Sequence, residues 1–121
     1  MASPITLDRL DEGVALVTVA GEQDVGTAPR LRERLTEALV DRTPLVVDLT
    51  DAISVDSAIL GVLLSGLRRA REQGSGFAVV LPDGPDSAVR RIFEVTGLMV
   101  VFPIFSTRDP AVAAVVARYA R

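Results

Sequence analysis

Short, nearly continuous apolar runs alternate with segments of helical periodicity along this chain. Three of the runs, Val14–Ala20, Pro44–Thr50 and Phe77–Leu81, consist largely of valine, leucine and alanine. Runs of this kind are typical of strands that are buried on both faces of a sheet. Because parallel strands in one sheet need a crossover between them, the alternation predicts an α/β fold with right-handed crossovers.

The segments between these runs carry apolar side chains at helical spacing. We expect four helices: one beginning after Thr27, one from Ser57 to about Gln73, one from about Asp86 to Thr96, and one opened by Asp109 and Pro110. Two further strands are predicted at Ile5–Leu10, as an edge strand that starts the chain with a β-hairpin, and at Leu98–Phe102. A loop is expected from the end of the second apolar run through Ser54.

The sum of these elements is a mostly parallel mixed sheet of about five strands with about four helices. No linker or repeat interrupts the pattern, so residues 1–121 are predicted to form a single domain. Ligand and partner sites in such folds tend to lie where strands lead into helices. Ser57 lies at one of these junctions.

Composition excludes several classes of protein. Cysteine and histidine are absent, so thiolate metal sites and catalysis through a Ser-His pair are excluded. The formal net charge of −3 argues against a nucleic-acid binder, because such proteins usually carry an excess of positive charge. The longest apolar runs, Ala58–Leu64 and Leu98–Phe105, are too short to span a membrane, and the first residues do not resemble a signal peptide. We expect a cytoplasmic protein without membrane insertion.

Three aspartates, Asp48, Asp51 and Asp56, allow two interpretations. Paired carboxylates can hold a metal or perform acid–base chemistry. Aspartate also favours turns and helix caps, which is the interpretation we prefer. A phosphoacceptor-aspartate receiver domain would have this length and alternation, but receivers use a lysine on a late strand, and all 13 positive residues here are arginine.

Ser57 follows Asp56 at the expected start of a helix, where it can be a cap, a nucleophile or a switch. No histidine, cysteine or lysine is available to activate it as a nucleophile. Either Asp56 or Ser57 can cap the helix. A phosphate on Ser57 would also be tolerated there, because a helix N-terminus presents free N–H groups and the positive end of the dipole.

Three segments together resemble STAS domains, and more narrowly the anti-sigma factor antagonists. The stretch VAGEQDVGTAPRLRERL (Val19–Leu35) is similar to the G-E-L-D segment of that family and the helix after it. LVVDLTDAISVDSAILGVLL (Leu45–Leu64) resembles its strand, loop and D-S-[ST]-G-L-G helix start. SAVRRIFEVTGLMVVFPIFSTRDPAVAAV (Ser87–Val115) resembles its V-x-R-[LI]-F tail.

The resemblance implies a partner-switching protein that is not itself an enzyme and needs no cofactor or metal. Such a protein binds an anti-sigma factor serine kinase of the GHKL ATPase type and thereby releases a sigma factor. Phosphorylation of the serine, here Ser57, ends the binding, and a metal-dependent serine phosphatase restores it. The implied partner-binding residues are Gly21, Glu22, Asp24, Asp56, Ser57, Ala58 and Ile59.

The sequence departs from the family pattern just after the serine. Ala58 and Ile59 stand where the family usually has Ser or Thr and then Gly, and Gln23 replaces a leucine. We expect Ile59 to add apolar bulk where a partner approaches, and Gln23 to make its loop more polar. An alternative therefore stays open: a STAS interaction module that is not phosphorylated, either a constitutive antagonist or a subunit of a larger signalling or lipid-transport complex.

Overall fold

The sheet places its strands in the order in which they occur along the chain. The computed structural model describes residues 4–120, the side chains of residues 118–120 excepted. Within that range, five strands form one sheet in the order β1-β2-β3-β4-β5. The strands are β1 (Ile5–Arg9), β2 (Ala15–Glu22), β3 (Leu45–Ser54), β4 (Phe77–Val80) and β5 (Ile104–Phe105).

Strand directions follow from the connections. The β1–β2 hairpin is antiparallel, and β2, β3, β4 and β5 pair in parallel across helical crossovers. The α-helices of the described residues are α1 (Ala28–Ala38), α2 (Ser57–Gln73), α3 (Ala88–Val95) and α4 (Arg108–Ala120), and two short 3-10 helices cover Val40–Arg42 and Leu98–Val100. The predicted α/β fold, with its mixed sheet and hairpin start, is confirmed.

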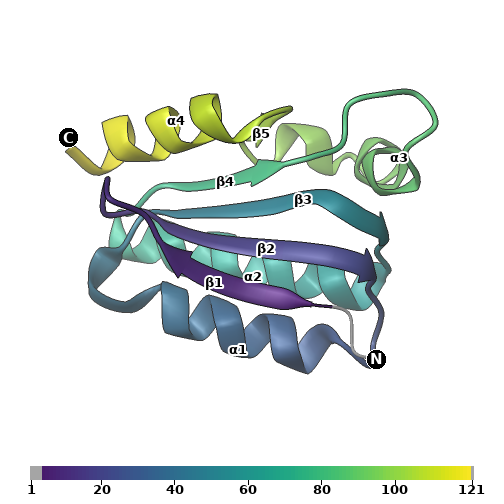
Figure 1. Cartoon of the computed structure of the whole chain (residues 1–121), viewed down its shortest axis with the longest axis horizontal. Coiled ribbons are helices and arrows are strands. Elements are labelled where there is room, and N and C mark those ends of the chain that lie inside the picture. Colours follow the sequence, from purple (N-terminus) through teal and green to yellow (C-terminus); the bar gives the residue numbers. More distant parts are fainter. Residues whose placement is uncertain (1–3, 121) are drawn as a thin grey trace.

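Helices cover both faces of the sheet (Figure 1). Helices α1 and α2 pack on one face against strand residues such as Val17, Val47 and Val79. Helix α4 packs on the other face, where Ala111 and Val115 contact a second group of strand side chains. Alternate strand residues thus serve opposite faces, which is why these strands read as continuous apolar runs.

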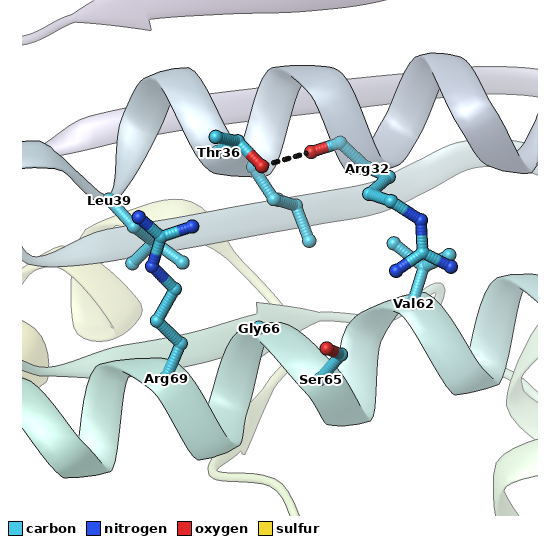
Figure 2. Close-up of a pocket in the computed structure, with 8 residues that line it drawn as sticks. Arg32, Thr36, Leu39, Val62, Ser65, Gly66 and Arg69 are labelled. Carbon is cyan, nitrogen blue, oxygen red and sulfur yellow. Dashed lines mark hydrogen bonds between the residues drawn. The ribbon is translucent and has the colours of Figure 1, made fainter.

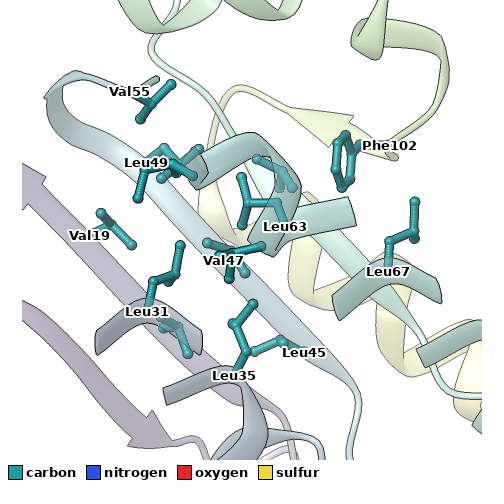
Figure 3. Packing of buried hydrophobic residues seen from close by; sticks show 14 of the residues in the cluster. Val19, Leu31, Leu35, Leu45, Val47, Leu49, Val55, Leu63, Leu67 and Phe102 are labelled. Carbon is teal, nitrogen blue, oxygen red and sulfur yellow. The ribbon is translucent and has the colours of Figure 1, made fainter. Parts of the chain in front are cut away.

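The larger core lies between the sheet and the pair α1 and α2 (Figure 3). It fixes α2 over the middle of the sheet, because Ile59, Leu63 and Leu67 are almost completely buried there. A Cβ on Gly66 of α2 would lie 3.0 Å from Cδ1 of Leu35 on α1, so the two helices approach closely. None of the helices in the described residues is long and apolar enough to cross a membrane.

Strand β3 is longer than predicted. The loop expected through Ser54 is instead the last part of the strand, which pairs Asp51 with Ala20 and Ser54 with Glu22 beyond a register shift. Asp51 and Ile53 are exposed while Ala52 between them is buried, so the segment alternates as a half-exposed strand does. Polar residues within this alternation led us to expect a loop.

The last strand was predicted in the wrong place. Residues Leu98–Val100 form a 3-10 turn after Gly97, which has a left-handed φ of 76°, and the strand begins only at Ile104. The turn directs Phe102 into the core, where its ring centroid lies 6.1 Å from that of Phe77. One apolar run therefore supplies a turn and a core anchor before the strand. Helix α4 also begins two residues earlier than expected, at Arg108 and not at Pro110, with Asp109 inside its first turn.

Candidate functional site

Ser57 is the first residue of α2 and is exposed. The capping residue is Asp56, whose Oδ1 accepts hydrogen bonds from the backbone N–H groups of Ala58 at 3.0 Å and Ile59 at 3.1 Å. Asp56 and not Ser57 therefore caps the helix. Within residues 4–120, its hydroxyl has no hydrogen-bond partner and is open to solvent.

The second carboxylate oxygen of Asp56 reaches a different part of the chain. Its Oδ2 accepts a hydrogen bond of 3.1 Å from the backbone N–H of Val25, in the loop between β2 and α1. One carboxylate thus joins this loop to the start of α2. The backbone N–H of Gln23 also donates to the carbonyl of Ser54 at 2.9 Å, so the ends of β2 and β3 are held together.

The loop between β2 and α1 has its own internal order. Asp24 accepts a 2.8 Å hydrogen bond from the N–H of Gly26 through Oδ1, and its own N–H donates to Oγ1 of Thr27 at 3.0 Å. Gly21 adopts a φ of 77°, a left-handed conformation that favours glycine over other residues. Glu22 and Asp24 are both exposed. The sequence-predicted residues Gly21, Glu22, Asp24, Asp56 and Ser57 are brought to one end of the sheet.

Ile59 lies elsewhere. It is completely buried in the larger core, because the second residue after Ser57 turns toward the sheet. The expectation that Ile59 adds bulk where a partner approaches is wrong, and its side chain is not available to a partner of the folded chain. Ala58 is half-buried and packs against the same core.

Gln23 also differs from the expectation. Its side chain is 1% exposed, and its Nε2 donates a hydrogen bond of 2.8 Å to the carbonyl of Ala20. Gln23 therefore does not make the surface of the loop more polar. It occupies an interior position under the loop.

Two exposed apolar side chains at this end of the sheet were not predicted. Val25 is 74% exposed in the loop before α1, and Ile53 is 66% exposed near the end of β3. We call the surface formed by Asp24, Val25, Ile53, Asp56 and Ser57 the docking surface. The alternation of Asp51, Ala52 and Ile53 is the sequence signal for an outward-facing Ile53.

The three aspartates do not assemble into one cluster. Asp48 is 2% exposed on β3 and pairs with Arg108 at the start of α4, while its other oxygen accepts from both the N–H and Oγ1 of Thr50. Asp56 is occupied as a cap. The described residues contain no group of three side chains suited to hold a metal ion. The preferred interpretation, that these aspartates serve turns and caps, fits the contacts of Asp56, whereas Asp48 lies within β3 and pairs with Arg108.

The described residues thus combine one mixed five-stranded sheet with an exposed serine at the start of α2. The family model of the STAS domain matches residues 8–111, and the chain belongs to this family.

Known proteins of similar sequence cover nearly the same length. The anti-sigma-F factor antagonist RsfB of Mycobacterium tuberculosis (strain H37Rv) is 34% identical over 119 residues, which are 95% of this chain and 94% of that protein. The anti-sigma-B factor antagonist of Bacillus subtilis is 30% identical over 104 residues, 86% of this chain and 93% of that protein. A crystal structure of an anti-sigma factor antagonist from Mycobacterium paratuberculosis shares 35% identity, covers 94% of both chains and has a TM-score of 0.82.

Proposed function

We propose that this protein is an anti-sigma factor antagonist that binds an anti-sigma factor serine kinase through the docking surface. Binding sequesters the kinase and releases a sigma factor, and phosphorylation of Ser57 ends the binding. The observation that carries the proposal is the exposed, unbonded hydroxyl of Ser57 next to an aspartate that already caps α2. The relatives named above are antagonists of anti-sigma factors and support the same assignment.

The surroundings of Ser57 suit a phosphate that changes binding without unfolding the domain. Ser57 lies in the first turn of α2, near the positive end of the helix dipole, which favours negative charge. A phosphoserine adds about −1.5 to −2 charges at neutral pH. That charge would lie directly beside Asp56, whose carboxylate is bonded to the backbone N–H of Val25 in the neighbouring loop. A partner that docks on neutral and apolar groups there would be repelled.

The proposed partners follow from this switch. A kinase of the GHKL ATPase type would be both the binding partner and the enzyme that modifies Ser57, and a metal-dependent serine phosphatase would reverse the modification. In this proposal, residues 1–121 act as one cytoplasmic module, with Gly21 and Glu22 supporting the loop that presents Asp24. The protein is then a ligand and a substrate, without chemistry of its own.

The alternative of an unphosphorylated module rests on the departures Ala58 and Ile59. The buried position of Ile59 removes the apolar surface expected from it, while Ala58 still stands directly after Ser57. A pull-down distinguishes the two functions, because recovery of a lipid-transport complex without a kinase would favour the alternative.

The direct test uses the kinase that the wild-type chain recovers in the pull-down. It compares the affinities of wild type, Ser57→Asp and Ser57→Ala for this kinase. We expect Ser57→Asp to weaken binding by more than tenfold, or about 1.4 kcal/mol, while Ser57→Ala binds like wild type. Isothermal titration calorimetry gives all three affinities. Equal affinity of Ser57→Asp and Ser57→Ala would contradict a role of charge at this position.

A further inference from the structure

A groove between α1 and α2 lies away from the docking surface, midway along both helices. Its volume is about 180 Å³. The floor is apolar and consists of Leu35 of α1, Leu39 just after that helix, and Val62 and Gly66 of α2. This volume is below the roughly 300 Å³ of pockets that hold drug-sized ligands, so an occupant would be small.

Two arginines reach across this groove from opposite sides (Figure 2). Arg32 extends from α1 toward Val62 of α2, and Arg69 extends from α2 toward Leu39, just after α1. The hydroxyl-bearing residues Thr36 and Ser65 lie between them, and Thr36 donates through its Oγ1 to the carbonyl of Arg32 at 2.9 Å. The two guanidinium groups therefore flank a small space with an apolar floor.

The charges lining the groove are unbalanced, although the chain as a whole is acidic, with a net charge of −3. No acidic residue lines it. Three arginines of the described residues are in ion pairs: Arg34 with Glu37 at 3.0 Å, Arg90 with Glu94 at 3.7 Å, and Arg108 with Asp48. In the part of the chain that the structure describes, neither Arg32 nor Arg69 takes part in an ion pair.

We propose that the groove binds a small organic dianion, either a dicarboxylate or a phosphate monoester, between Arg32 and Arg69. Two guanidinium groups match two negative charges, and arginine pairs well with carboxylate and phosphate because its donors form a fork. The hydroxyl of Ser65 adds a donor, and the apolar floor accommodates the carbon skeleton of the ligand. This site is independent of the proposed phosphorylation of Ser57.

The test is an NMR titration of the full chain with succinate and, separately, with glycerol 3-phosphate. We expect saturable shifts of the amides of Thr36, Ser65 and Gly66 with a Kd of about 1 mM or tighter for at least one of the two probes. The probe that binds identifies the anion as carboxylate or phosphate. Acetate, which carries a single charge and a short skeleton, should bind at least about tenfold more weakly.

Variants locate the binding. Arg32→Gln and Arg69→Gln should each raise the Kd by about tenfold or more. Arg68→Gln is the matched control, because Arg68 is also exposed on α2 but lines the opposite groove; it should leave the Kd almost unchanged. All three side chains are exposed, so the variants should keep the wild-type amide spectrum elsewhere.

Several results would overturn the proposal. The absence of saturation with both probes would do so, as would equal losses of affinity in Arg68→Gln and Arg69→Gln. Acetate binding as tightly as succinate would remove the need for a dianion. A response to a polyglutamate peptide alone would assign the groove to an acidic protein segment instead.

Discussion

Asp56 is the residue that connects the parts of the docking surface. One of its oxygens caps α2 and the other holds the N–H of Val25, so a single side chain orders both the helix that carries Ser57 and the loop beside it. Ser57 is thereby left exposed and unbonded within the described residues. At the scale of single residues, the cap and the proposed phosphorylation site are two adjacent residues with separate tasks.

Replacing Asp56 should lower the stability of the domain. Asp56→Ala removes the cap and leaves the N–H of Val25 without its acceptor, so we expect a loss of about 1–2 kcal/mol in the free energy of unfolding. Urea denaturation measures this. Asp56→Asn keeps a cap of similar strength and should retain most of the stability. If Asp56→Ala were as stable as wild type, the two hydrogen-bonded contacts would carry no net free energy.

Ile59 should matter for folding and not for the surface. Ile59→Ala creates a cavity under α2 and should lower the free energy of unfolding by about 2–4 kcal/mol. The folded fraction of this variant should bind the kinase with wild-type affinity. Loss of affinity without loss of stability would instead place Ile59 on the partner surface.

Elements that carry their own boundary signals were predicted well. The limits of α2, Ser57 and Gln73, match the expectation because Asp56 caps one end and Gly74, with a φ of 73°, ends the other. Elements without such signals were misplaced. The apolar run from Leu98 begins as a 3-10 turn. Phe102 then packs in the core against Phe77, and the strand follows at Ile104.

The sequence also predicted only part of the candidate site. The motif located Ser57 and Asp56, but whether a given side chain near them faces outward depends on the pairing of β3 with β2 and on the turn of α2 over the sheet. Sequence alone therefore assigned Ile59 to the surface and missed Ile53. Burial of one and exposure of the other follow from tertiary packing.

The ends of β3 and the loop before α1 should supply the apolar part of binding. We expect Val25→Ser and Ile53→Ser each to weaken kinase binding by about tenfold, since exposed apolar groups at an interface lose water on docking. Stability should change by less than about 0.5 kcal/mol, as for most exposed positions. Surface plasmon resonance measures the affinity.

Val100→Ser provides the matched control for these variants. Val100 is 90% exposed on the 3-10 turn after α3, away from the loop before α1. It should leave the affinity unchanged. A loss equal to that of Val25→Ser would move the binding surface toward α3.

At the scale of the whole molecule, the sheet and its helices form a scaffold that carries the docking surface at one end. Helices α1 and α2 begin at that end, where Val25 in the loop before α1 is bonded to Asp56, the residue before Ser57. In the proposed switch, we expect the packing of α2 over the sheet to keep this end in place when a phosphate is added. The phosphate would then change the surface presented to a partner and leave the fold intact.

The most direct measurement is the position of phosphate after the chain is incubated with ATP and the anti-sigma factor serine kinase that it recovers from cells. Mass spectrometry should find one phosphate, on Ser57, and none in Ser57→Ala. Phosphorylated chain should no longer bind the kinase while its circular dichroism spectrum stays that of wild type. A chain that binds the kinase but carries no phosphate on Ser57 would contradict the account.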